Sequence, residues 1–212
     1  MQWKAWALAG ALAGSCAWAN AQARVVQIDF AHTRPSQDAR DMAAWVASSG
    51  DASGKPFAIV DKKNARLFLF DASHRLLGST EVLLGSTFGD ESFEGVGERT
   101  QTGQVGLHER TTPAGRFETS PGRNPSGEDI VWLDFDAAFA IHRVRPGAQF
   151  AERLARLRSA TPRDNRISLG CVVVPVAFYL EQVQPLFGRG QGVVYVLPET
   201  RTLQAQLEQL SL

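Results

Sequence analysis

Between residues 57 and 84, short runs of β-branched and aromatic residues alternate with tight turns. The runs are F-A-I-V (57–60), A-R-L-F-L-F (65–70) and R-L-L-G-S-T-E-V-L-L (75–84), and they are separated by D-K-K-N (61–64) and D-A-S-H (71–74). Runs of this length, bounded by turn-forming residues, are typical of antiparallel strands joined by hairpins. The pattern predicts a β-meander.

The second half of the chain adds strands and a few helices. Strands are predicted at 129–135, 138–142 and 192–198, and apolar residues recur at helical spacing in A-Q-F-A-E-R-L-A-R-L-R (148–158). Pro175 suits the first turn of a helix that follows it. Residues 85–110 are rich in Gly, Glu, Thr and Ser, which predicts a long exposed loop of the kind that often borders a site. We expect a mainly β fold with a few helices (α+β).

The first 23 residues have the pattern of a secretory signal peptide. A single positive charge, Lys4, precedes a short alanine-rich apolar run, and A-Q-A (21–23) is a small-x-small cleavage site. The run is too short to favour a membrane-spanning helix. We expect cleavage after Ala23. The alternative is a lipoprotein signal at A-G-S-C (13–16), in which Cys16 would be lipidated.

The remaining chain divides into three parts. Residues 24–54 form a lead-in, in which Ser36 can cap a helix that places Met42, Trp45 and Val46 on one face. We expect this helix to be a packing arm on the main domain rather than a binding element. Residues 55–198 form that domain, and residues 199–212 form a tail with a short amphipathic helix.

The charge of the chain is balanced, with 22 Lys and Arg against 22 Asp and Glu. No basic surplus indicates nucleic acid as a partner. No His, Cys and Asp cluster has metal-ligand spacing, so we expect no metal and no cofactor. Loss of the signal peptide would leave Cys171 as the sole cysteine. Exported proteins usually pair their cysteines, so Cys171 is either a reactive free thiol or a buried inert one.

A cysteine acts as a nucleophile in its thiolate form, which a neighbouring imidazole can generate. Among the four histidines, only His142 lies in the same half of residues 24–212 as Cys171, at the end of a predicted strand. The alternative for His142 is a purely structural role. The pairing of one histidine with one exported free cysteine favours a nucleophile and its base; the other histidines are His32, His74 and His108.

Four stretches together resemble one protein family. I-H (141–142) followed by S-L-G-C (168–171) resembles the signature of the L,D-transpeptidase catalytic domain, the YkuD-like family of bacterial envelope enzymes. I-V-D-K-K-N-A-R-L-F-L-F-D (59–71), T-P-A-G-R-F (112–117) and G-V-V-Y-V-L (192–197) also match the family in order. The resemblance covers about residues 55–198.

The resemblance implies a β-sandwich-like fold and a periplasmic enzyme that acts on peptidoglycan. Family members cleave the bond before the terminal D-alanine of a tetrapeptide stem, through a thioester on the cysteine. The acyl group then passes to a side-chain amine of another stem, which makes a 3–3 cross-link. Some relatives transfer it to an outer-membrane lipoprotein, and some use water as carboxypeptidases. The sequence does not specify the acceptor.

Carried over by motif, Cys171 is the nucleophile and His142 is its base and later the acid for the leaving group. Ser168 would position the catalytic groups, and Gly170 would let the backbone approach the scissile carbonyl. The N–H of Cys171 and nearby amides would form an oxyanion hole. Arg143 and Arg166 are candidates for binding stem carboxylates, although solvated surface positions are the alternative.

Two positions depart from the family pattern. Leu169 stands where histidine is common, and Val173 stands where arginine or asparagine is usual. Both departures favour a second hypothesis, a catalytically silent domain that binds peptidoglycan or a partner protein. A third hypothesis, an unrelated cysteine peptidase or amidase, would share the Cys–His pair but not T-P-A-G-R-F.

Overall fold

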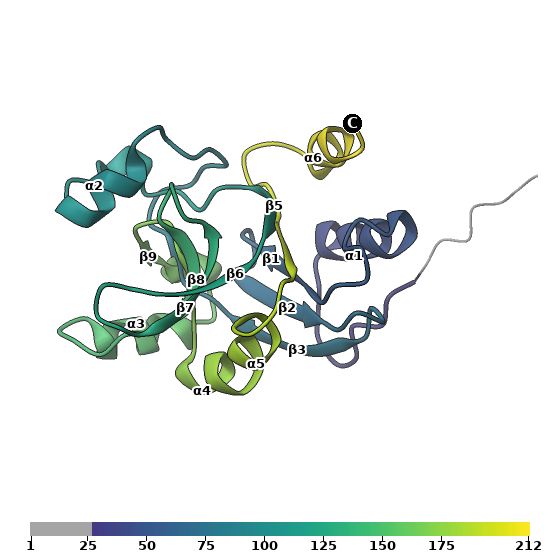
Figure 1. Ribbon diagram of the computed structural model, residues 1–212, viewed down its shortest axis with the longest axis horizontal. Coiled ribbons are helices and arrows are strands. Elements are labelled where there is room, and N and C mark those ends of the chain that lie inside the picture. The colour runs from purple at the N-terminus through teal and green to yellow at the C-terminus, as the bar shows by residue number, and fades with distance from the viewer. Residues whose placement is uncertain (1–26) are drawn as a thin grey trace, which may run out of the picture.

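The computed structural model describes residues 27–212 (Figure 1). The predicted signal peptide and Cys16 lie outside the described residues. The fold is mixed, with two main β-sheets and several helices. Within residues 27–212, no helix combines the length and apolar character needed to cross a membrane.

The larger sheet has five strands and contains the predicted meander. Strand β1 (Phe57–Asp61) lies at its centre, antiparallel to β2 (Arg66–Phe70) and parallel to β11 (Val193–Val196). The spatial order is β3 (Leu76–Glu81), β2, β1, β11 and β5 (Gly115–Glu118). The meander prediction is therefore confirmed, and the predicted last strand lies beside the first.

The smaller sheet has four strands and carries the candidate site. Its order is β10 (Val172–Val174), β8 (Phe139–Arg143), β7 (Asp129–Asp134) and β6 (Ser120–Arg123), with β10 parallel to β8. A separate parallel pair joins β4 (Leu84–Gly85) to β9 (Arg166–Ser168). The short strands β5, β6, β9 and β10 were not predicted.

Alternation along the strands builds two cores on the faces of the larger sheet. On β1, Ala58 and Val60 belong to a cluster shared with the smaller sheet, whereas Phe57 and Ile59 belong to a cluster shared with the terminal helices. Both faces of β1 are covered, which explains why its sequence is continuously apolar.

Helices α1 (Gln37–Ser49) and α6 (Leu203–Leu210) cover the outer face of the larger sheet. Ser36 caps α1 by accepting a hydrogen bond from the Ala39 N–H, as predicted, and Met42 and Val46 are buried. The lead-in helix thus packs on the domain. The other predicted helices also form, as α3 (Phe150–Leu157) and as a continuous helical segment of α4 (Val176–Phe178), the π-helix η3 (Tyr179–Val183) and α5 (Gln184–Phe187).

Residues 85–110 are more structured than a loop. They contain helix α2 (Val96–Thr102) and the 3₁₀ turn η1 (Leu107–Glu109). Gly97 allows α2 to lie directly on the turn before β8, because a Cβ atom at this position would lie 2.0 Å from the carbonyl oxygen of Asp136. The prediction of a long exposed loop was therefore wrong for α2. Outside this segment, a second 3₁₀ turn, η2 (Pro162–Asn165), precedes β9.

Candidate active site around Cys171

Cys171 directly precedes strand β10, which pairs with the strand that carries His142. In the parallel pairing of β10 with β8, Val173 lies opposite His142, and Val172 lies opposite Ile141. Cys171 directly precedes β10, so alternation continued by one residue would place its side chain on the face of Val173 and His142. The pairing of Cys171 with His142 as nucleophile and base stays a prediction.

The imidazole of His142 is oriented by its own strand. Its Nδ1 atom lies 2.8 Å from the carbonyl oxygen of Arg143. A carbonyl oxygen can only accept a hydrogen bond, so Nδ1 carries the proton. In the neutral imidazole, Nε2 is then the acceptor, which is the form that a general base requires.

His142 is buried and Cys171 is partly buried, and desolvation shifts the pKa of each toward its uncharged form. His142 is only 7% exposed. Burial lowers the pKa of His142 to about 3, and the nearby positive charge of Arg145 acts in the same direction. Burial also raises the pKa of the Cys171 thiol above its ordinary value, although the Ala140 amide and the charge of Arg145 oppose this shift. Near neutral pH the site therefore holds a neutral thiol and a neutral imidazole.

The thiol is not hydrogen-bonded to the imidazole. Sγ of Cys171 donates to the carbonyl oxygen of Ala138, at 3.4 Å. Within residues 27–212, which the structure describes, no hydrogen bond joins Cys171 to His142. Catalytic hydrogen bonds are often loose without substrate and tighten when it binds.

Ser168 and Gly170 shape the turn that presents Cys171. The Ser168 hydroxyl donates to the Cys171 carbonyl oxygen at 2.7 Å and accepts from the Gly170 N–H at 3.1 Å. Gly170 has a φ of +145°, and a Cβ atom there would lie 2.7 Å from the Thr111 carbonyl oxygen. Glycine is required at this position by both its backbone conformation and its close packing.

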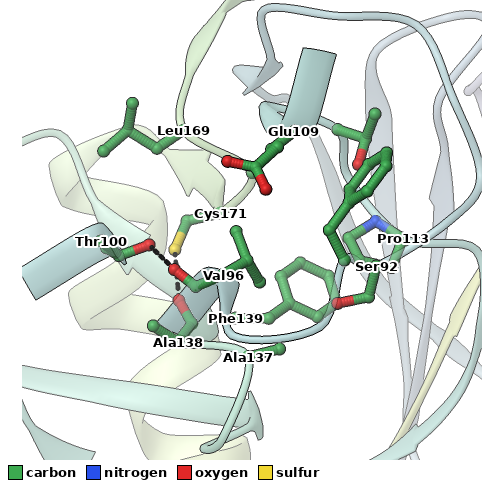
Figure 2. A pocket seen from close by; sticks show the side chains of 13 residues that line it. Ser92, Val96, Thr100, Glu109, Pro113, Ala137, Ala138, Phe139, Leu169 and Cys171 are labelled. Carbon is green, nitrogen blue, oxygen red and sulfur yellow. Dashed lines mark hydrogen bonds between the residues drawn. The ribbon is translucent and has the colours of Figure 1, made fainter. Parts of the chain in front are cut away.

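A narrow pocket opens beside the thiol (Figure 2). One wall comes from α2 and the residues before it, and the opposite wall comes from the Cys171 turn. Glu109 reaches into this space, where it accepts hydrogen bonds from Arg99 and from the Gly106 N–H. Residues 85–110 were predicted to border a site. From this segment, the pocket is lined by Ser92, Phe93, Val96, Thr100 and Glu109.

The two departures from the family pattern have different surroundings. Val173 is 3% exposed and packs with Leu83, Val144 and Leu157. An apolar residue therefore suits this position. Leu169 is 42% exposed and lines the pocket beside Cys171. It places a methyl-bearing surface where a family member usually has an imidazole.

Both arginines predicted to bind substrate have protein carboxylates as partners. Arg143 donates to Asp129 at 3.1 Å and stacks over the Tyr179 ring. Arg166 is buried and pairs with Glu199, with its guanidinium over the Phe88 ring. A role for Arg143 and Arg166 in binding stem carboxylates stays a prediction.

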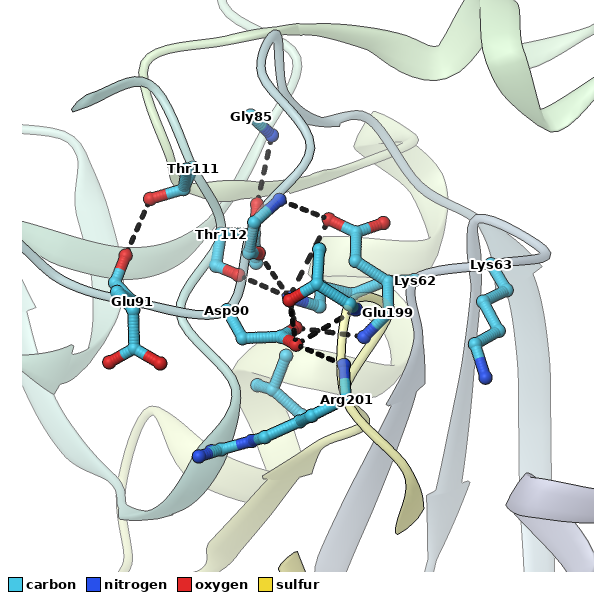
Figure 3. A network of polar contacts seen from close by, with 12 residues as sticks. Lys62, Lys63, Gly85, Asp90, Glu91, Thr111, Thr112, Glu199 and Arg201 are labelled. Atoms are coloured by element: carbon cyan, nitrogen blue, oxygen red, sulfur yellow. Dashed lines mark hydrogen bonds and ion pairs between the residues drawn. The ribbon is translucent and has the colours of Figure 1, made fainter. Parts of the chain in front are cut away.

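The sequence reading missed a buried charged network next to the site (Figure 3). It consists of Lys62, Asp90, Glu199 and Arg166, whose side chains are 0–5% exposed. Lys62 was read only as part of a turn, because nothing in D-K-K-N distinguishes a buried lysine from the exposed Lys63 beside it. Among the described residues, no group of three His, Cys, Asp or Glu side chains is arranged to hold a metal ion.

Comparisons with known proteins give a partial structural likeness. No family model and no curated protein matches the sequence. The crystal structure of the L,D-transpeptidase (residues 123–326) from Xylanimonas cellulosilytica DSM 15894 aligns with a TM-score of 0.38 and 18% sequence identity. The alignment covers 67% of this chain and 60% of that chain, so this chain spans less than two thirds of the length of that structure.

Proposed function

We propose that this chain is an exported, cysteine-dependent peptidoglycan L,D-transpeptidase that acts on tetrapeptide stems. The observation that carries the proposal is the position of Cys171 directly before the strand that pairs with the strand of His142, whose imidazole is held in the tautomer of a base. The four family-like stretches in the sequence, which include S-L-G-C and T-P-A-G-R-F, support the same reaction.

The first half-reaction makes a thioester. As Sγ of Cys171 attacks the carbonyl carbon before the terminal D-alanine, Nε2 of His142 takes the thiol proton. The Cys171 N–H stabilises the developing oxyanion. The C–N bond then breaks, and His142 returns the proton to the departing amine of D-alanine. A neutral pair suits this step, because the proton moves only when the substrate is in place.

The second half-reaction releases the acyl group to an acceptor. An amine of a second stem attacks the thioester carbonyl, the C–S bond breaks, and a 3–3 cross-link forms while the thiol regains a proton. Transfer to an outer-membrane lipoprotein would follow the same chemistry. Water as the acceptor would make the protein an L,D-carboxypeptidase.

Mass-resolved product analysis tests this function. Purified residues 24–212 would be incubated with disaccharide-tetrapeptides beside a Cys171→Ala control. Cross-linked dimers that have lost D-alanine would support transpeptidation, and tripeptides alone would indicate carboxypeptidase activity. Cys171→Ala should give neither product.

A catalytically silent binding domain is the second candidate. It is favoured by Leu169 and Val173, which lack hydrogen-bond donors, and by the contact of the thiol with Ala138 rather than with His142. This candidate predicts no product from folded protein together with retention of the protein on peptidoglycan sacculi.

A further inference from the structure

The turn that carries Cys171 is fastened to the rest of the protein through Thr112. The Thr112 hydroxyl donates to the carbonyl oxygen of Gly170 at 2.8 Å and accepts from the Gly85 N–H at 2.8 Å. Thr112 is 0% exposed. One buried hydroxyl therefore satisfies two backbone groups, and one of them belongs to the peptide unit that precedes Cys171.

The hydrogen bond from Thr112 also fixes the direction of the Cys171 N–H. The Gly170 carbonyl and the Cys171 N–H belong to the same planar peptide group, and in the trans form they point in opposite directions. A hydrogen bond that fixes the carbonyl therefore also fixes the direction of the N–H. Under the proposed function, this N–H is the donor that meets the developing oxyanion.

Lys62 in turn binds the backbone of Thr112 (Figure 3). Its Nζ atom donates to the carbonyl oxygens of Thr112 and Gly89 and to Oδ1 of Asp90, each at 2.7 Å. These contacts use all three N–H groups of an ammonium ion. Lys62 thus joins two segments that flank the site, residues 89–90 and residue 112, to the end of the central strand β1.

Asp90 extends the network to the C-terminal side of the larger sheet. Its carboxylate accepts hydrogen bonds from the backbone N–H groups of Glu199, Thr200 and Arg201. Glu199 in turn pairs with Arg166 at the start of β9, the strand that leads into the Cys171 turn. The network contains two cations and two anions, so its buried charges balance.

We propose that Thr112 and Lys62 are positioning residues that aim the Cys171 N–H for acyl transfer; this inference rests on the proposed function. Three family-like stretches meet in this chain of hydrogen bonds, since Lys62 lies in I-V-D-K-K-N, Thr112 in T-P-A-G-R-F and Gly170 in S-L-G-C. Glu199 follows the fourth stretch within two residues. The hydrogen bonds between these stretches hold the peptide unit of Gly170 and Cys171, and no single stretch holds it alone.

The test compares Thr112→Val, which has a similar shape without the hydroxyl, with Thr112→Ser, which keeps the hydroxyl. Steady-state kinetics would be measured on the soluble monomer fraction. The thiols in that fraction would be counted by complete alkylation after unfolding, and kcat would be expressed per thiol. Removal of one oxyanion donor lowers kcat by ~10²–10³-fold, so we expect a misaimed donor in Thr112→Val to lower kcat by ~10–100-fold. KM should change by less than about 3-fold, and Thr112→Ser should restore most of the lost kcat.

Thr119→Val is the matched control. The Thr119 hydroxyl is also buried and accepts from a backbone N–H, that of Gly192 at 2.7 Å, but it lies away from the Cys171 turn. Its loss should leave kcat within about 2-fold of the wild type. If Thr112→Val does not fold, Thr112→Ala replaces it, because the smaller side chain leaves room for water at Gly85 and Gly170.

Two results would overturn the inference and are distinguishable. Unchanged kcat in a folded Thr112 variant without the hydroxyl, or a Thr112→Ser variant as defective as Thr112→Val, would overturn the positioning role alone. Absence of any product from the wild type would overturn the proposed function and the inference with it.

Discussion

Two sets of ionisable side chains lie near each other in this protein, and they differ in whether a counter-charge accompanies them. His142 is buried and Cys171 partly buried, neither with a counter-charge, and desolvation shifts the pKa of each toward its neutral form. Lys62 and Asp90 are buried 2.7 Å apart as an ion pair; burial lowers the pKa of Lys62, and the hydrogen bond to Asp90 opposes that shift. Burial alone would raise the pKa of Asp90, but hydrogen bonds from Lys62 and Thr200 hold it well below its ordinary value.

The two sets of side chains therefore suit different roles. A neutral thiol and imidazole can exchange a proton during a reaction, whereas a lysine with all three N–H groups bonded is fixed in place. The first pair is suited to chemistry and the second to holding the backbone around it. Each of the following predictions tests this division.

The largest effect is expected for His142→Asn on catalysis. Loss of a positioned general base lowers kcat by ~10²–10⁴-fold, because the thiol then has no local proton acceptor. Turnover of disaccharide-tetrapeptides by the wild type and the variant would measure it. The free energy of unfolding at neutral pH should change far less than the rate. Equal rates in both proteins would remove His142 from the reaction.

Substitution of Lys62 should affect stability in addition to the aim of the Cys171 N–H. Lys62→Met leaves the buried Asp90 carboxylate without its cation, which typically costs ~3–5 kcal/mol. The neighbouring Lys63 pairs with Asp38 at an exposed position, and Lys63→Met should cost less than about 1 kcal/mol. Urea unfolding of the three proteins would show the difference. Equal losses from the two adjacent lysines would refute the supporting role of the network.

The two sets should also respond to acid in different pH windows. Because the pKa of folded His142 is about 3, the unfolded state binds the proton first, and stability is lost as pH falls below 6.5. Between about pH 7 and about pH 5 this loss amounts to ~2 kcal/mol, and it should disappear in His142→Asn. The lowered pKa of Asp90 adds a loss that begins only near pH 3.8. Chemical unfolding at several pH values would separate the two windows.

The smallest effects are expected at the two departures from the family pattern. Val173→Thr buries a hydroxyl in an apolar cluster and should cost about 1 kcal/mol. Leu169→His changes a half-exposed side chain and should alter stability by less than about 0.5 kcal/mol. Thermal unfolding would measure both. A large loss from Leu169→His would mean that the pocket wall depends on this leucine for packing.

Much of the fold follows from local sequence patterns. The meander, the capped helix α1 and the helical segment after Pro175 were predictable, because alternation, a cap and a turn residue each act over a few neighbours. Helix α2 was not, since its V-G-E-R-T-Q-T sequence has little apolar periodicity and is held by a close contact of Gly97 with Asp136. That contact depends on a segment about forty residues further along the chain.

The candidate site was predictable in part for the same reason. Cys171 and His142 could be paired because each is rare, and because His142 ends one β-rich run and Cys171 precedes another. The support from Lys62 and Thr112 could not, because it depends on distances between segments that only the folded chain brings together. The carboxylate partners of Arg143 and Arg166 belong to this class as well.

The most direct test of the neutral pair is the rate at which iodoacetamide alkylates Cys171 as a function of pH, in the wild type and in His142→Asn. A neutral pair predicts slow alkylation at neutral pH and a single rise centred above 9.0, the ordinary pKa of a thiol. The same rise should occur without the imidazole. A fast plateau between about pH 4 and about pH 8 that is lost in His142→Asn would reveal a preformed thiolate and imidazolium, and it would contradict the neutral resting state.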